Sequence, residues 1–102
     1  MRRNGKKLRA VHPGEVLYEE FMHPLGLSMN RLALELRVPV TRVSEIVRGR
    51  RAVSSETALR LAHYFDTTPQ FWMNLQTRYD LEVAEEENME RIKREVHPVS
   101  VG

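Results

Sequence analysis

The sequence predicts an all-α fold of five short helices followed by a C-terminal helical extension. Three observations support this prediction. Apolar residues recur at helical spacing, residues that start or stop helices separate these segments, and alternation typical of strands is missing. The chain has 102 residues, enough for one compact domain, and 41% of them are hydrophobic, enough to form a core.

The first predicted helix begins after a turn at His12-Pro13-Gly14. It runs from about Glu15 to Met22, and its buried side is Val16, Leu17 and Phe21. Residues 23–27 contain a proline and a glycine, which both interrupt helices. We therefore expect residues 23–27 to stop this helix.

Residues 28–48 are predicted to form two short helices joined by a tight turn. Ser28 can cap the first helix. A residue before a proline is pushed out of the helical conformation, so the chain turns at residues 37–39. The second helix runs from about Val40 to Arg48. The inward faces of the pair are Leu32, Ala33 and Leu36, then Val43, Ile46 and Val47.

The second helix of this pair has a polar stripe that faces away from its apolar one. The stripe consists of Thr41, Ser44, Glu45 and Arg48. Between Arg31 and Arg60 there are seven arginines and three glutamates, a local net charge of +4. A helix that fits the DNA major groove, presented on a basic rim, is typical of a helix-turn-helix recognition element.

Two further helices complete the predicted domain. Ser54 can cap the first of them, and Glu56 lies in its first turn, where the helix dipole favours a negative charge. Its core face is Ala58, Leu61, Ala62 and Phe65. Thr68 can cap the last helix, with Pro69 at the first helical position. This helix contains Phe71, Trp72, Leu75 and Tyr79.

Beyond Tyr79 the helix either continues or restarts. A sparse apolar stripe, Met89, Ile92 and Val96, is too thin to bury itself and needs a partner surface. His97-Pro98 ends the helix, and residues 99–102 form either an extended tail or an added edge strand. The domain organisation is therefore a basic arm over residues 1–11, a DNA-binding domain over 12–79, and an acidic helix and tail over 80–102.

The two ends of the chain carry opposite charge. Residues 1–10 hold five positive charges and no negative one, whereas residues 80–95 hold seven acids and three bases, a net of −4. Either the two ends bind different partners or both are merely solvated. The basic arm either lies along phosphates, adding salt-sensitive affinity, or has no specific role.

Composition and motifs argue against an enzyme. The chain has no cysteine, which excludes disulfides, thiolate zinc sites and a cysteine nucleophile. The histidines at 12, 23, 63 and 97 lack metal-binding spacing, and neither G-x-x-x-x-G-K-[ST] nor G-x-S-x-G occurs. We expect no cofactor and no metal. Without a membrane-crossing run or an apolar signal-peptide stretch, we expect a cytoplasmic protein.

Several sequence blocks resemble a known family. They are His12-Pro13-Gly14-Glu15, Pro24-Leu25-Gly26-Leu27-Ser28, Glu45-Ile46-Val47-Arg48-Gly49-Arg50-Arg51, Thr57-Ala58-Leu59-Arg60-Leu61-Ala62 and Pro69-Gln70-Phe71-Trp72-Met73-Asn74-Leu75-Gln76. Together they are similar to the HigA, or VapI-like, antitoxins among the Xre or Cro-like repressors. The resemblance spans roughly residues 12–84. It implies a dimer that binds a palindromic operator, represses its own operon and neutralises a toxin, a small basic ribonuclease that cleaves messenger RNA on the ribosome.

The resemblance also implies roles for individual residues. The base-reading positions are Val40, Thr41, Ser44 and Glu45, and the phosphate-binding positions are Ser28, Arg42, Arg48, Arg50 and Arg51. The dimer interface is Phe71, Trp72, Leu75 and Tyr79. Two alternatives stay open. The first is that Glu45 pairs with Arg48 or Arg42 on the helix instead of reading a base. The second is that Phe71 and Trp72 are core residues, or stack on a nucleic-acid base, instead of forming the dimer interface.

Two positions depart from the family pattern. Arg37 stands at a turn position that is often glycine, and Met29 stands where a phosphate-binding glutamine is frequent. Either the turn is not left-handed or Arg37 carries strain of about 1 kcal/mol. These two departures favour one alternative, a protein-interaction module that has lost DNA binding. The other alternative is a transcription regulator without a toxin, which a missing neighbouring toxin gene would favour.

Overall fold

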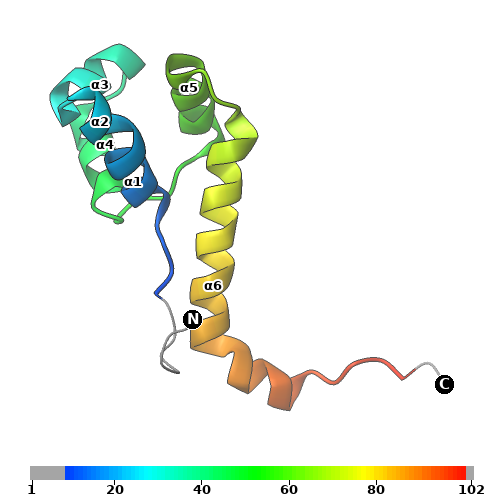
Figure 1. The fold of residues 1–102 in the computed structure, drawn as a ribbon. Helices are drawn as coiled ribbons and strands as arrows, with labels where there is room; N and C mark the ends of the chain where they lie inside the picture. The colour runs from blue at the N-terminus through cyan, green and yellow to red at the C-terminus, as the bar shows by residue number, and fades with distance from the viewer. Residues whose placement is uncertain (1–8, 101–102) are drawn as a thin grey trace.

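The computed structural model describes residues 9–100 and is helical, with no strand among those residues. The elements are α1 (Pro13–Val16), the π-helix η1 (Leu17–Met22), α2 (His23–Leu25), α3 (Met29–Leu36), α4 (Val40–Val47), α5 (Ser55–Phe65) and α6 (Pro69–Glu95) (Figure 1). The predicted all-α class is confirmed. None of these helices is both long and apolar enough to cross a membrane, as far as residues 9–100 show.

The first helix ends inside the segment 23–27 that was predicted to stop it, at Leu25, three residues beyond the approximate end at Met22. α1, η1 and α2 form one continuous segment, because the residues at both junctions keep helical backbone angles. In η1 the N–H groups bond to carbonyls five residues back, as His23 does to Tyr18. A proline ring inside an α-helix clashes with the carbonyl four residues back, and here Pro24 lies just beyond the wider π-turns of η1. The segment ends at Gly26, which is left-handed with φ 65°.

α3 and α4 form the predicted helix-turn-helix. The Oγ of Ser28 accepts a hydrogen bond from the Arg31 N–H at 3.0 Å and caps α3. Arg37 adopts the left-handed conformation, with φ 61° and ψ 46°, and the Val38 N–H closes the turn by donating to the Ala33 carbonyl at 3.1 Å. A side chain at such angles costs about 1 kcal/mol. Of the two readings left open for Arg37, the strained left-handed turn is therefore the one observed.

α5 and α6 begin at their predicted caps. The Ser54 Oγ accepts from the Thr57 N–H at 3.2 Å, and the Thr68 Oγ1 accepts from the Phe71 N–H at 3.1 Å. Pro69 occupies the first helical position of α6, where its missing N–H costs nothing. These local signals therefore place both helix starts correctly.

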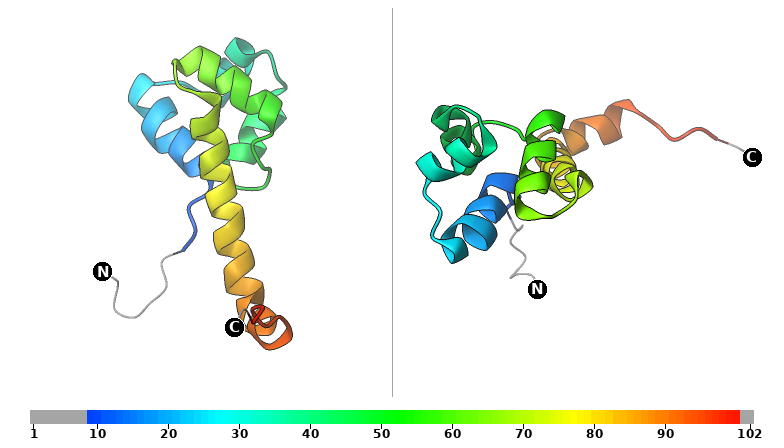
Figure 2. Two further views of the ribbon diagram at one scale, coloured as in Figure 1. Left: turned by 90° about the vertical axis from the view of Figure 1, so that its right-hand side faces the viewer. Right: turned by 90° about the horizontal axis from the view of Figure 1, so that it is seen from above.

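α6 continues without a break for 27 residues. The sequence left open whether the helix restarts after Tyr79, and the predicted boundary between residues 79 and 80 lies inside this single helix. The C-terminal half of α6 projects away from the other helices (Figures 1 and 2), which gives the molecule dimensions of 56 × 32 × 22 Å. Residues 96–100 are neither helix nor strand, so the described part of the tail does not form the edge strand.

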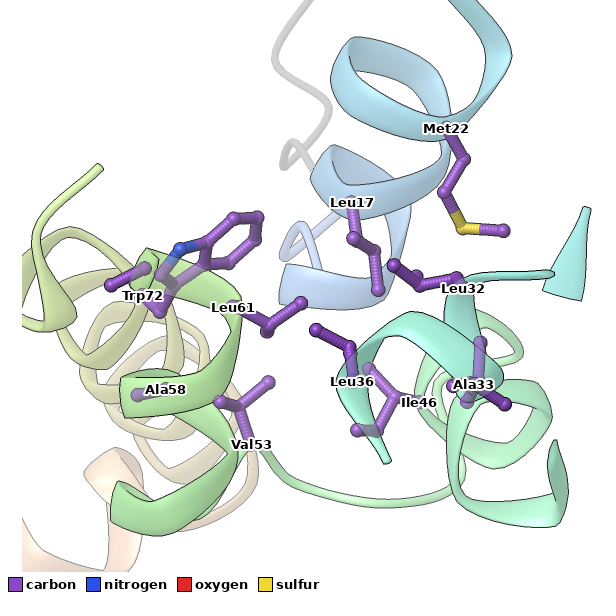
Figure 3. Packing of buried hydrophobic residues seen from close by; sticks show 12 residues of the cluster. Leu17, Met22, Leu32, Ala33, Leu36, Ile46, Val53, Ala58, Leu61 and Trp72 are labelled. Atoms are coloured by element: carbon purple, nitrogen blue, oxygen red, sulfur yellow. The ribbon is translucent and has the colours of Figure 1, made fainter. Parts of the chain in front are cut away.

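The core lies where the N-terminal helical segment meets α3, α4, α5 and the start of α6 (Figure 3). Its buried hydrophobic residues are Leu17, Met22, Leu32, Ala33, Leu36, Val43, Ile46, Val53, Ala58, Leu61, Ala62 and Trp72. Trp72 is 0% exposed, and its Nε1 donates to the Thr67 Oγ1 at 2.9 Å, so its polar atom is satisfied. This core fixes α4 from behind and leaves its opposite side free.

Candidate nucleic-acid interface

α4 turns its apolar side chains inward and its polar side outward. Val43 and Ile46 are 2% and 1% exposed, which places them in the core. The other side holds the four residues predicted to read bases, two of them exposed and two half-buried: Val40, Thr41, Ser44 and Glu45. These positions share one face over the first two turns of α4, which is the part of a recognition helix that contacts base edges.

Two of these four residues are held by arginines. Arg48 donates to the Ser44 Oγ, and the Nε of Arg51 lies 2.7 Å from the Glu45 Oε1. Glu45 is therefore paired, but its partner is Arg51 rather than Arg48 or Arg42, the partners that the sequence left open as an alternative. Solvent-exposed pairs of this kind contribute about 0–1 kcal/mol, so DNA can displace them at small cost.

The remaining predicted phosphate-binding arginines differ in their freedom. Arg42 is half-buried, with its Nη1 3.8 Å from the Glu56 Oε1, and Glu56 also pairs with Arg60 at 3.0 Å. Arg50 is exposed and forms no ion pair with any residue between 9 and 100. Arg50 is thus the arginine of this surface that is most available for a phosphate.

The N-terminus of α3 supplies a second kind of anion contact. Ser28 is exposed, and the first-turn N–H groups that it does not cap point outward at the helix start. Met29, the departure from the family pattern, is half-buried and packs against the core. The methionine therefore has a packing role in this chain, and phosphate contacts here fall to Ser28 and the backbone.

α4 is supported from behind by residues that the sequence indicated only as a turn. A Cβ added to Gly14 would lie 1.8 Å from the Ile46 carbonyl oxygen, so the backbones of α1 and α4 are in direct contact. His12 caps α1 through its Nδ1, which accepts from the Gly14 N–H at 2.9 Å. Gly49, with φ 75°, lies against the His12 ring. The His12-Pro13-Gly14-Glu15 block was the one sequence signal for this support.

The residues predicted to form a dimer interface do not all reach the surface. Trp72 is 0% exposed within one chain, so it cannot touch a second copy and the prediction is corrected at this residue. Phe71 is 37% exposed, and Leu75 and Tyr79 are half-buried. The Tyr79 ring stands edge-on to His12, with centroids 4.8 Å apart. Helical spacing alone did not identify Trp72 as the buried one, because the four residues lie on adjoining faces of α6.

At the N-terminal end of the described chain, Arg9 is held by α1. Its guanidinium donates two hydrogen bonds of 2.8 Å to the Glu15 carboxylate. This pair lowers the pKa of Glu15 and raises that of Arg9. The other charges of the predicted basic arm lie in residues 1–8, outside the described residues, so the prediction of an arm on phosphates stays a prediction.

The described residues offer no built metal site. Between residues 9 and 100, no three His, Asp or Glu side chains come together as metal ligands. The chemistry available on the outer side of α4 is therefore that of hydroxyl, carboxylate, methyl and guanidinium groups. These are the groups that proteins use on base edges and phosphates.

Comparison with known proteins agrees with this geometry. Residues 19–72, about half of the chain, match the helix-turn-helix family model. The chain is 48% identical over 81 residues to virulence-associated protein I of Dichelobacter nodosus, covering 79% of this chain and 75% of that protein. It is 36% identical over 75 residues to antitoxin HigA-1 of Vibrio cholerae, covering 74% of this chain and 70% of that protein.

A solved structure gives the same result. The Pseudomonas aeruginosa antitoxin HigA with the higBA promoter is 43% identical and superposes with a TM-score of 0.89, covering 90% of this chain and 100% of that one. These matches confirm the resemblance inferred from the sequence blocks. The chain belongs to the Xre-like helix-turn-helix family and, within it, to the HigA antitoxins, a class of DNA-binding transcription regulators and not of enzymes.

Proposed function

We propose that this antitoxin is a dimer that represses its own operon through α4 and neutralises a basic toxin. The observation that carries the DNA-binding part is the outward polar face of α4, bordered by the arginines of the turn that follows it. A relative whose structure contains its promoter supports the same use of the fold. Because a repressor must reach the chromosome, the proposal places the protein in the cytoplasm.

Base reading follows from the chemistry of the four outward residues of α4. Val40 and the methyl group of Thr41 are exposed and can contact thymine methyl groups. Ser44 can bond to several base edges, and Glu45 can accept from the N4 amino group of cytosine. Glu45 becomes available when Arg51 leaves it for a phosphate. In this scheme one exchange supplies both a base contact and a phosphate contact.

Phosphate binding falls to the residues around this helix. Arg50 is the strongest candidate because it has no competing carboxylate among the described residues. Arg48 and Arg51 reach phosphates after releasing their partners on α4, and Arg42 contributes less because it is half-buried beside Glu56. The other contact is Ser28 with the free N–H groups at the start of α3.

Dimerisation is proposed along α6. Palindromic DNA requires a two-fold axis that places two α4 helices in successive major grooves, about 34 Å apart. The C-terminal half of α6 projects away from the other helices (Figure 2) and carries exposed apolar residues, with Leu81 59% and Ile92 37% exposed. A second copy would cover them together with the exposed part of the domain. The proposed contact residues are Phe71, Leu75, Tyr79, Leu81 and Ile92.

The proposed toxin contact uses the charge of the same projecting helix. Residues 80–95 carry a net charge of −4, and their side chains are mostly exposed. A small basic ribonuclease would be attracted to this segment, as charge complementarity favours. The alternative is a transcription regulator without a toxin. Lack of a toxin gene beside this one, and lack of a complex when the neighbouring product is co-expressed, would favour that alternative.

The test of base reading against phosphate binding uses three alanine variants. Thr41→Ala, Arg50→Ala and the control Thr77→Ala, an exposed threonine on α6, are titrated against the DNA upstream of the gene and a scrambled duplex. Arg50→Ala should weaken binding to both duplexes and reduce the salt slope by about 1. Thr41→Ala should reduce the preference for the upstream duplex over the scrambled one. We expect the difference in binding free energy between the two duplexes to fall by about 1 kcal/mol, the lower end of the range for a specific base contact.

The control should match the wild type on both duplexes. Equal losses on both duplexes for Thr41→Ala would contradict the assignment of α4 to base reading. Retention of the full salt slope by Arg50→Ala would contradict its assignment to a phosphate.

A further inference from the structure

His12 lies where α1, α6 and the turn after α4 meet. The residue is 8% exposed. Its Nδ1 caps α1 by accepting from the Gly14 N–H at 2.9 Å. Its ring stands edge-on to Tyr79 of α6, with centroids 4.8 Å apart and planes at 75°. One side chain therefore joins the first helix to the last.

The same ring also faces the turn that follows α4. A Cβ at Gly49 would lie 3.7 Å from the His12 ring, in ordinary contact. The backbone of Arg51 lies close enough to His12 to raise the pKa of the ring. Arg50 and Arg51 in this turn are proposed phosphate contacts, so His12 touches the backbone that carries them.

α6 holds the far end of this loop as well. Gln76 is 5% exposed, accepts from the Val53 N–H at 2.7 Å and donates to the Asp80 carboxylate at 2.9 Å. Gln76 and Tyr79 lie one turn apart on α6. One stretch of α6 thus reaches residue 53 directly and residues 49–51 through His12.

α1 adds a direct contact with the recognition helix. The Cα of Gly14 packs so closely on α4 that a Cβ there would lie 1.8 Å from the Ile46 carbonyl oxygen. His12 is two residues before Gly14 and is hydrogen-bonded to it. A shift of the His12 ring is therefore transmitted to the C-terminal end of α4 and to the following turn.

We propose that His12 is a positioning residue for DNA binding, which holds the turn of residues 49–51 in one geometry relative to α4 by linking it to Tyr79. The proposal rests on the proposed DNA-binding face and adds a connection from α6 to it. Because α6 is also the proposed site of dimer and toxin contacts, a partner that moves α6 at Tyr79 loosens the arginines of the turn. Operator affinity is then coupled to what α6 binds.

The neutral form of the His12 imidazole is the one that fits the observed contacts. The charged groups that act on the ring are Asp80 on α6 and Glu15 on α1. Burial lowers the pKa of His12 and outweighs the opposing effects of Asp80, the Arg51 backbone and Glu15. The Nδ1 must be unprotonated to accept from Gly14. Protonation would therefore break the cap and disturb the turn together.

The test variant is His12→Asn, because asparagine still caps a helix but has no ring. A matched control is His23→Asn, since His23 is exposed and its ring stacks on Tyr18 with centroids 5.9 Å apart. Dissociation constants for the upstream duplex are measured for both variants and the wild type in steps from about pH 7.5 to about pH 5, spanning histidine titration. Circular dichroism and thermal unfolding report the fold of each variant.

We expect His12→Asn to stay folded and to bind about tenfold more weakly at the upper pH. The ratio of its dissociation constant to that of the wild type should shrink toward one as the pH falls, because the wild type loses its neutral ring. His23→Asn should follow the wild type throughout. A folded His12→Asn that binds like the wild type, or a ratio that stays constant with pH, would mean that His12 only caps α1.

If His12→Asn does not fold, the wild type still decides. The titration of the His12 ring is followed by NMR with and without the upstream duplex. The proposal expects DNA to lower the pKa of His12, because binding selects the neutral ring. An unchanged or raised pKa of His12 would overturn it. A wild type that shows no preference for the upstream duplex would contradict the proposed function. The ratio of dissociation constants between His12→Asn and the wild type, measured on the scrambled duplex, would then test the role of His12.

Discussion

The two halves of α6 are held in different ways, although they form one helix. In the first half Trp72 and Gln76 are 0% and 5% exposed, and both contact other elements. In the second half Leu81 is 59% exposed, and seven acids lie between residues 80 and 95. The first half completes the core, whereas the side chains of the second half are mostly exposed. The first half of α6 thus serves folding, whereas partner binding is proposed for the second half.

The largest expected effect comes from a pair of alanine substitutions, one in each half of α6. The pair tests whether the two halves differ in their contribution to stability. Trp72→Ala should lower the free energy of unfolding by about 3–5 kcal/mol, because it empties the centre of the core. Leu81→Ala should change it by less than about 0.5 kcal/mol. Urea unfolding at one low protein concentration measures both. Similar losses for the two variants would show that the projecting half belongs to the fold of the single chain.

A second pair of variants tests how closely α1 packs against α4. Gly14→Ala should cost about 2–3 kcal/mol, because the new Cβ would meet the Ile46 carbonyl and force the helices apart. Gly26→Ala is the control, since its Cβ meets nothing within 4 Å and its φ of 65° alone costs about 1 kcal/mol. Thermal unfolding compares the two. A Gly14→Ala variant no less stable than Gly26→Ala would contradict the close packing.

A smaller effect is expected in the turn of the helix-turn-helix. Arg37→Gly should raise the free energy of unfolding by about 0.5–1 kcal/mol, because glycine adopts the left-handed angles without strain. Asp66, also left-handed with φ 58°, provides the comparison, and Asp66→Gly should gain less because aspartate tolerates this region better. Urea unfolding of both variants is the measurement, and a destabilised Arg37→Gly would refute the strain.

The smallest effect is the pH dependence of stability. The folded-state pKa of His12 is lowered, so the unfolded chain binds more protons as the pH falls below the ordinary histidine value of about 6.5. Stability is therefore full above that value and declines below it. Glu15 acts in the same direction at lower pH, because Arg9 lowers its pKa. Melting temperatures of the wild type and His12→Asn between about pH 7.5 and 5 measure the histidine part. A wild type that grows more stable toward pH 5 would contradict this sign.

The sequence predicted the helix starts well because each start is a local event. Ser28, Ser54 and Thr68 each accept from the N–H three residues later, and that geometry needs no distant partner. The core faces of α3, α4 and α5 followed from helical spacing for the same reason. The candidate site was predictable in the same way, because it is the side of α4 opposite the buried one.

Features that depend on distant contacts were not predictable. The π-helix η1, which lies just before Pro24, has no local signal in the sequence. The pairing of Glu45 with Arg51 depends on a loop that folds back over α4, not on helical spacing. Trp72 differs from its neighbour Phe71 only in which side of α6 meets the core. The role of His12 at three elements could be found only from the fold.

The central claim is that the outer face of α4 reads a specific sequence in the operator. The most direct measurement is a titration of the wild-type protein against the DNA upstream of its own gene and a scrambled duplex, at two salt concentrations. The account predicts a preference for the upstream DNA that survives the higher salt, because base contacts do not depend on counterion release. Equal and salt-sensitive binding to both duplexes would contradict it, and would leave the basic surface as a purely electrostatic feature of a protein-interaction module.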